Sequence, residues 1–140
     1  MSRPHRSMIG LAAVLALLVT AGGAYGAGRV LFSGKTAQHQ PISFAIASHK
    51  VTGLNFWIDL HCAHHRTRRF HALRFSAFAI TGSSFDQKFK STGGSARVMG
   101  TIHGHRITGS VWLNTVAAHC SGTTKYGVTR PHRRPAKAAS

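Results

Sequence analysis

The residues best suited to chemistry are histidines and a cysteine gathered in one short segment. His61, Cys62, His64 and His65 lie within five residues of one another, in a chain with 11 histidines. Imidazole and thiolate are common ligands of Zn²⁺ and Cu²⁺, and short spacings are typical of such ligands. His61, His64 and His65 are therefore candidate ligands of an extracytoplasmic metal site. Solvated loop histidines are the simpler interpretation, because the sequence contains no H-E-x-x-H motif.

A surplus of positive charge is the second chemical feature. The 140 residues include 18 Lys and Arg but only 2 Asp and Glu, a net charge of +16. Since arginine pairs well with phosphate and carboxylate, we expect weak binding to anionic envelope polymers or lipid head groups. A solvated basic surface is the alternative. The candidate residues form one cluster in an expected loop, 66–74, and one in the C-terminal tail: Arg66, Arg68, Arg69, Arg74, Arg130, Arg133 and Arg134.

The scarcity of acids argues against several classes of enzyme. Asp59 and Asp86 are too few for an all-carboxylate Ca²⁺ or Mg²⁺ site, and they leave a two-carboxylate hydrolase no supporting acid. No nucleophile elbow, P-loop or dinucleotide motif occurs. Aromatic residues are not interleaved with the arginines, as they would be in a nucleic-acid surface. We expect a non-enzymatic protein with no cofactor and no specific nucleic-acid partner; a scattered Ser-His-Asp triad is a weaker alternative.

The N-terminus has the three parts of a secretory signal peptide. Residues 3–6 are basic, residues 8–21 are uncharged and mostly apolar, and small residues follow. The pattern predicts a signal helix, cleavage after Ala24 or Gly26, and a secreted or envelope-associated protein. A retained anchor is the alternative, because the apolar and small residues together could just span a membrane.

Cys62 and Cys120 form an isolated pair after this signal. Outside the cytosol such a pair is most simply a disulfide. Because the loop between them is long, chain-entropy arithmetic gives about 4 kcal/mol of stabilisation. A free thiolate that binds a metal or acts as a nucleophile is the alternative.

Alternation of apolar and polar residues predicts strands in the rest of the chain. Leu54, Phe56, Ile58 and Leu60 share one face, with Cys62 in step. Gly104-His105 predicts a type II′ turn between strands 97–103 and 106–114. Further strands are expected over 42–47, over 72–80 with a bulge, over 85–90 and 123–128, and over 30–36 as an edge.

These elements predict a single all-β domain, either an antiparallel β-sandwich or a partly closed barrel of seven to eight short strands with one disulfide. The chain has no Glu, 15 Gly and no long stretch with a helical period after the signal. We expect three segments: a signal peptide over 1–24, the cationic β domain over 25–128 and a disordered basic tail over 129–140.

From about residue 34 to 128 the chain resembles a group of short exported bacterial β-rich proteins of unknown function. The pattern is G-K-T-x-Q-x-x-P-I-S-F, then an apolar strand with a Cys, then G-T, then C-x-G. Its residues here are Gly34, Lys35, Thr36, Gln38, residues 41–44, Val51, Leu54, Phe56, Cys62, Gly100, Thr101, Gly104, Gly109, Cys120 and Gly122. The resemblance implies a β fold with core apolar residues, turn glycines and one Cys pair. It brings no activity or cofactor, and the basic segment after Cys62 departs from it.

Overall fold

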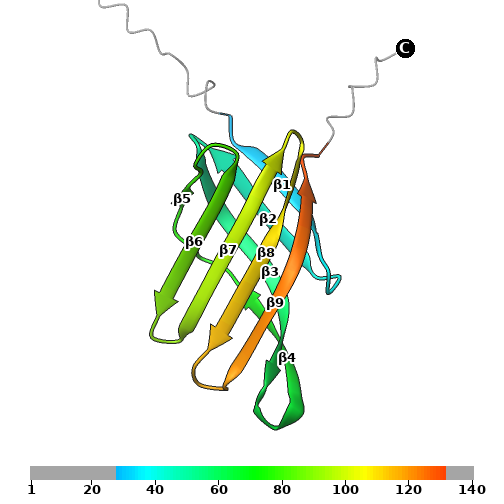
Figure 1. Cartoon of the computed structure of the whole chain (residues 1–140), viewed down its shortest axis with the longest axis vertical. Coiled ribbons are helices and arrows are strands. Elements are labelled where there is room, and N and C mark those ends of the chain that lie inside the picture. The colour runs from blue at the N-terminus through cyan, green and yellow to red at the C-terminus, as the bar shows by residue number, and fades with distance from the viewer. Residues whose placement is uncertain (1–27, 132–140) are drawn as a thin grey trace, which may run out of the picture.

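The computed structural model describes residues 28–131, which form nine β-strands and no α-helix (Figure 1). The strands are β1 (Val30–Thr36), β2 (Pro41–Ala47), β3 (Lys50–Cys62), β4 (Arg66–Ala72), β5 (Phe78–Ala79), β6 (Ser84–Ser91), β7 (Gly94–His103), β8 (Arg106–Thr115) and β9 (Cys120–Thr129), with a 3₁₀ turn η1 (Ala63–His65). The all-β prediction is confirmed. Within the described residues, no helix is long and apolar enough to cross a membrane. The predicted signal peptide and most of the predicted tail lie outside this range.

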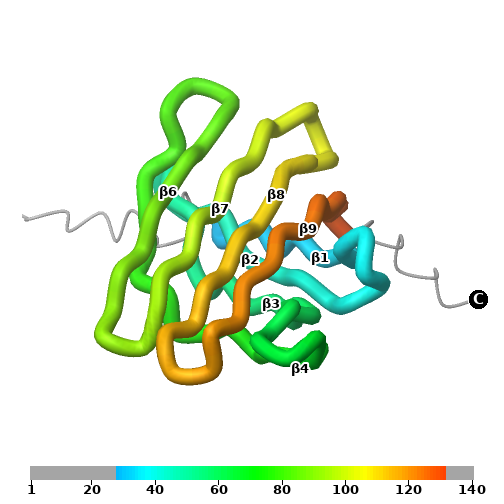
Figure 2. Tube along the Cα trace, turned by 60° about the horizontal axis from the view of Figure 1, so that its bottom comes forward, coloured from blue at the N-terminus to red at the C-terminus, as the bar shows by residue number. Residues whose placement is uncertain are grey.

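The strands form an antiparallel sheet that closes on itself in one part. Their order is β4-β3-β2-β1-β9-β8-β7-β6, and β3 also pairs with β9 through His61 and Ser121. Strands β1, β2, β3 and β9 thereby make a closed four-stranded barrel, from which β8, β7 and β6 extend. Figures 1 and 2 show β6–β9 as one layer that lies across β1–β3. Of the two predicted architectures, the partly closed barrel is the one observed.

A disulfide between Cys62 and Cys120 fastens the barrel where β3 meets β9. The two Cα atoms are 3.9 Å apart, directly beyond the His61–Ser121 pair. Cys120 is fully buried and Cys62 is half-buried. The predicted bridge is confirmed, and a structural disulfide is typical of an oxidising, extracytoplasmic environment.

The core lies between the two layers and is rich in aromatic rings. The ring of Phe44 lies 6.0 Å from Phe32, 6.0 Å from Phe85 and 6.2 Å from Tyr126, centroid to centroid. Edge-to-face and offset contacts of this kind add to the stabilisation that comes from burial. The inward face of β3 is buried as its alternation predicts, at Leu54, Phe56, Ile58 and Leu60.

Two glycines in the middle of strands allow close packing: Gly100 leaves room for the Phe85 and Tyr126 side chains, and a Cβ atom on Gly109 would meet the β7 backbone at Met99. Gly100 and Gly109 lie opposite each other on β7 and β8, and Tyr126 lies opposite Gly109 on β9. A Cβ atom on Gly100 would clash with a core aromatic ring and lie 2.7 Å from the Tyr126 hydroxyl. That hydroxyl donates a 2.9 Å hydrogen bond to the Met99 carbonyl, and burial raises the pKa of the phenol. These two are therefore packing glycines. Only Gly104, with a φ of +60°, occupies the predicted hairpin turn.

Residues 63–80 and β1 differ from the sequence prediction. The expected loop 66–74 contains strand β4, and the expected strand 72–80 is irregular apart from β5. Strand β4 covers the later half of the 13-residue β3, which would otherwise expose an unpaired edge. Its own charged side chains are typical of a protected edge strand. The first strand, in contrast, is not an edge, because β1 pairs with both β2 and β9.

Candidate functional site

The arginines expected to form one cluster in segment 66–74 separate into three groups. Arg66 and Arg68 lie on one face of β4, because side chains two residues apart in a strand share a face. Arg69 lies on the opposite face, where it is the register partner of Asp59. Arg74 follows the strand in a left-handed conformation, with a φ of +66°, and lines a separate hollow. Only Arg66 and Arg68 act together.

Arg66 and Arg68 line a hollow of about 350 Å³ where the β3–β4 hairpin meets the β8–β9 turn. The other lining residues are Cys62, His64, His119 and three alanines, so no carboxylate lines it. The disulfide joins the two segments that form its walls. Two permanent guanidinium charges and two imidazoles, which are cationic when protonated, thus converge on one small concave surface.

Arg69 is engaged within the protein. Its Nε donates to Asp59 Oδ1 at 2.8 Å and its Nη2 to Oδ2 at 3.4 Å. This hydrogen bonding, helped by the charge of the guanidinium, holds the pKa of the Asp59 carboxyl below its ordinary value. The Asp59 backbone is fixed in turn by the Gln38 amide, which accepts from its N–H at 2.8 Å and donates to its carbonyl at 2.9 Å.

The outer face of the β3–β4 hairpin is filled by its own cross-strand pairs. The rings of Trp57 and His71 stack with centroids 4.2 Å apart and planes inclined by 5°. His71 Nε2 and Asn55 Oδ1 share a 2.6 Å hydrogen bond. Together with the Arg69–Asp59 pair, these contacts stabilise the hairpin and leave Trp57 stacked on one side.

The candidate metal ligands His61, His64 and His65 are not assembled into a site. His61 lies on β3, while His64 and His65 lie in η1 with φ values of 62° and 56°. Over residues 28–131, no group of three or more His, Cys, Asp or Glu side chains is placed to hold a metal ion. Five histidines in this range occupy left-handed turn positions, which histidine adopts more readily than most residues. Turn geometry thus accounts for much of the histidine content.

Of the second predicted arginine cluster, only Arg130 lies within the described residues, and it lies at the other end of the molecule from the β3–β4 hairpin. The Arg130 backbone N–H donates to the His105 carbonyl at 3.0 Å, beside the β7–β8 turn. Figure 1 shows this end opposite the β3–β4 hairpin along the long axis. Arg133 and Arg134 lie outside the described residues. Arg130 is therefore not part of the surface that Arg66 and Arg68 form.

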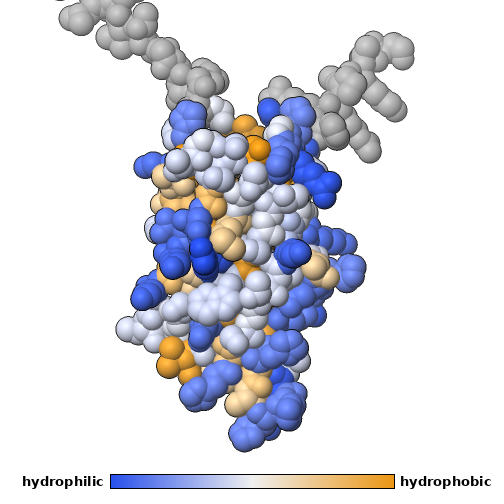
Figure 3. Space-filling model, in the orientation of Figure 1, coloured by the Kyte–Doolittle hydropathy of each residue, from blue (hydrophilic) through white to orange (hydrophobic). Residues whose placement is uncertain are grey.

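A third set of cations, which the sequence analysis missed, lies on the outer face of β6–β9. Lys88, Arg97, Trp112 and Thr123 are aligned in one row across the four strands. Arg97 donates to Asp86 through Nε at 2.9 Å and Nη2 at 2.6 Å, and these bonds hold the pKa of the Asp86 carboxyl below its ordinary value. Figure 3 shows near-neutral side chains along the middle of this face and hydrophilic ones on its flanks.

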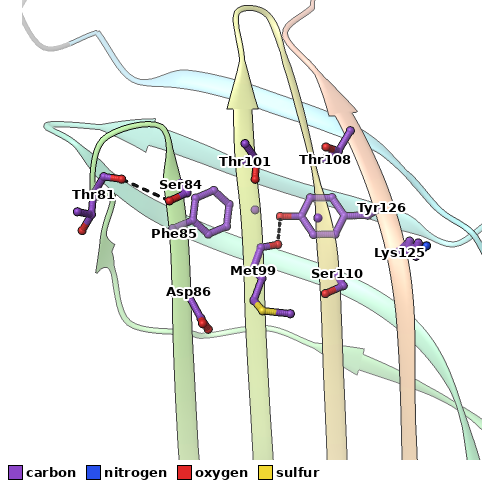
Figure 4. A pocket seen from close by; sticks show the side chains of 12 residues that line it. Thr81, Ser84, Phe85, Asp86, Met99, Thr101, Thr108, Ser110, Lys125 and Tyr126 are labelled. Carbon is purple, nitrogen blue, oxygen red and sulfur yellow. Dashed lines mark hydrogen bonds between the residues drawn. The ribbon is translucent and has the colours of Figure 1, made fainter.

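A hollow of about 790 Å³, open to solvent, lies on the same face above the glycine pair (Figure 4). Its polar lining consists mainly of Ser and Thr hydroxyls. No histidine lines it, and its one acid, Asp86, is bound to Arg97. A hydroxyl nucleophile here would therefore have no histidine and no unpaired carboxylate as its base, and the one amine that lines the hollow is that of Lys125. The hollow offers hydrogen bonds to a ligand without the groups of a catalytic triad.

No family model, curated protein or solved structure matches this chain. The resemblance to short exported β-rich proteins therefore stays a prediction.

Proposed function

We propose that this protein is a non-enzymatic, exported cationic β domain that binds anionic polymers at the cell envelope through the hollow at the β3–β4 hairpin. The observation that carries the proposal is the convergence of Arg66 and Arg68, with His64 and His119, on a surface that has no carboxylate. Among residues 28–131 neither arginine is paired with a carboxylate, and such guanidinium groups are well suited to phosphate or carboxylate oxygens.

Charge and position support the same function. The net charge of +16 attracts polyanions from a distance, and a protruding hairpin gives an extended polymer access. The disulfide and the predicted signal peptide favour a location outside the cytoplasm, secreted or attached to the envelope.

The test compares two adjacent arginines that face opposite ways. Arg68→Gln and Arg69→Gln each remove one positive charge, but only Arg68 lines the hollow. Binding of polyphosphate is measured from low to physiological salt for both variants, for the wild type and for Arg66→Gln/Arg68→Gln. We expect the double variant to bind roughly tenfold more weakly at low salt, and its salt slope to fall by about 2.

The matched control decides between a local site and a general charge effect. Arg69→Gln should change polyphosphate affinity less than Arg68→Gln, because Arg69 is already bound to Asp59. Equal losses in both variants would mean that polyphosphate senses only net charge. An affinity that is independent of salt would contradict the electrostatic mechanism itself.

A further inference from the structure

The outer face of β6–β9 presents one large aromatic ring on an open sheet. Trp112 is half-buried, and it is the one Phe, Tyr or Trp whose strand position points to this face of the four strands. Its neighbours along β8 on the same face are Ser110 and Asn114, which are short. The half-buried indole therefore stands beside smaller side chains, which leave part of it accessible.

Cations border this ring. A hollow of about 520 Å³ is lined by the indole of Trp112, the thioether of Met99 and the side chains of Lys88, Lys90 and Arg97. Neighbouring strands are about 4.8 Å apart, so the backbone positions of Arg97 and Lys88 lie about 5 and 10 Å from that of Trp112 along the row. Positive charge is thus available within the reach of one ring-sized ligand.

Arg97 is held in place for such a ligand. Its bonds to Asp86 use Nε and Nη2, and among the described residues its Nη1 makes no hydrogen bond. Asp86 itself does not line the hollow. The carboxylate therefore fixes the guanidinium from one side, and the free edge can donate to an anion on the other.

The hollow continues into a groove. It shares Met99 and Ser110 with the larger hollow shown in Figure 4, where Thr101, Thr108 and Lys125 add hydroxyl and amino groups. The one acid that lines this larger hollow, Asp86, is paired with Arg97. From Trp112 to Thr108 the groove follows β8 for roughly 14 Å, at 3.4 Å per residue. Hydroxyls that donate and accept, along a surface of this length, suit a chain of sugars more than a single small ion.

We propose that this groove binds an acidic polysaccharide, a polymer whose sugar rings carry carboxylates, with one ring stacked on Trp112 and its carboxylate near Arg97 and Lys88. A neutral glycan would make no use of the positive charges of Arg97 and Lys88. A polyanion without rings would make no use of the Trp112 indole. Single-stranded nucleic acid stacks successive bases on several aromatic side chains, whereas this face offers one. The proposal rests on the proposed binding of anionic polymers, but it assigns a different face and a more specific ligand.

The experiment measures binding of three polymers to the full chain: an oligogalacturonate, a polyphosphate of similar charge and neutral dextran. Trp112→Ala is compared with Trp57→Ala, which removes a half-buried indole from the opposite part of the molecule. We expect Trp112→Ala to weaken oligogalacturonate binding at least tenfold and to change polyphosphate binding less than twofold. Trp57→Ala should leave both affinities near the wild-type values, and Trp112→Phe should restore part of the loss, because it keeps a flat ring.

Several results would overturn the proposal. They are an unchanged oligogalacturonate affinity in Trp112→Ala, dextran binding as tight as oligogalacturonate binding, or tighter Trp112-dependent binding of single-stranded DNA. If the urea midpoint shows that Trp112→Ala does not fold, Lys88→Gln, a change at an exposed residue, tests the groove instead. We expect Lys88→Gln to weaken oligogalacturonate binding severalfold, and an unchanged affinity would contradict the proposal. Loss of polyphosphate binding in Arg66→Gln/Arg68→Gln, with no effect at Trp112, would overturn this proposal and leave the proposed function standing.

Discussion

The β3–β4 hairpin and the outer face of β6–β9 each contain one of the protein's two acids, but they use it differently. In the hairpin, Asp59 binds Arg69 on the face opposite the hollow, so Arg66 and Arg68 stay unopposed. On the sheet, Asp86 binds the arginine that borders Trp112. One region therefore offers bare positive charge, and the other offers a positioned guanidinium beside an aromatic ring. The comparison shows how a single acid can either leave a cationic surface unmodified or give it a fixed shape.

The two regions also depend on different parts of the fold. The hairpin extends beyond the barrel and is connected to β9 by the disulfide. The sheet face is supported from behind by buried rings, among them Phe85 and Tyr126. Changes in the disulfide should therefore affect the hairpin first, and changes in the core under the glycine pair should affect the sheet first.

The largest expected effect comes from removing the disulfide. Cys62→Ser/Cys120→Ser should lower the free energy of unfolding by about 4 kcal/mol, because the bridge constrains a long loop in the unfolded chain. Urea denaturation measures this, with Ser121→Ala, an exposed neighbour, as the control. Where the variant is still folded, polyphosphate binding should fall more than oligogalacturonate binding. An unchanged urea midpoint, or equal losses for both polymers, would remove the distinction between the regions.

A smaller effect is expected under the sheet. Gly100→Ala places a Cβ atom against the Phe85 ring and the Tyr126 hydroxyl, and overpacking of this kind costs about 1–3 kcal/mol. Gly93→Ala is the matched control, because the new Cβ atom would lie 3.8 Å from Ser91 Oγ, an ordinary van der Waals contact. The Gly100 variant should also weaken oligogalacturonate binding and spare polyphosphate binding. Equal stabilities of the two variants would show that the core tolerates a methyl group there.

Much of the fold could be predicted from the sequence because burial leaves a period-two pattern. Leu54 to Leu60 and the β7–β8 hairpin alternate clearly, and Cys62 continues the inward phase to its disulfide partner. Strand β4 could not be found in this way, because an edge strand outside the barrel buries few side chains and its sequence is mostly charged. Its pairing is determined by the length of β3, which is a tertiary property.

The candidate sites, like the strands, could be predicted only where a local pattern in the sequence indicates them. The sequence predicts Arg66, Arg68 and Arg69 as one loop cluster, and a loop gives no reason for Arg68 and Arg69 to face opposite ways, as they do in β4. His119 joins the hollow through the disulfide, and no local pattern could show that. The row containing Trp112 could have been found, because the inward phases of Val98 and Val111 place Arg97 and Trp112 on the outer face.

The smallest effects should come from the two ion pairs, which allow the regions to be compared by matched changes. Asp86→Asn and Asp59→Asn each add one net positive charge and release one arginine, Arg97 and Arg69 respectively. Arg97 lines the groove and Arg69 lies away from the hollow. Because each variant adds positive charge, we expect Asp86→Asn to raise oligogalacturonate affinity roughly threefold at pH 7. Asp59→Asn should raise polyphosphate affinity by a smaller factor. Equal changes would mean that net charge alone governs binding in both regions.

The pH dependence of stability checks that these pairs form. Hydrogen bonds from the arginines lower the pKa of both carboxyls from the ordinary value of 3.8. Each pair therefore contributes stability above that pH and loses it as the pH falls through the lowered value. The difference in melting temperature between wild type and Asp86→Asn should be constant from pH 7 to 5 and shrink below pH 4. Both pairs are exposed, so the difference should be small and should decrease with salt. A difference in melting temperature that persists unchanged to pH 2 would show that Asp86 acts through its shape and not through its charge. Asp86 would then not fix the Arg97 guanidinium, and the distinction between the sheet and the hairpin would fail.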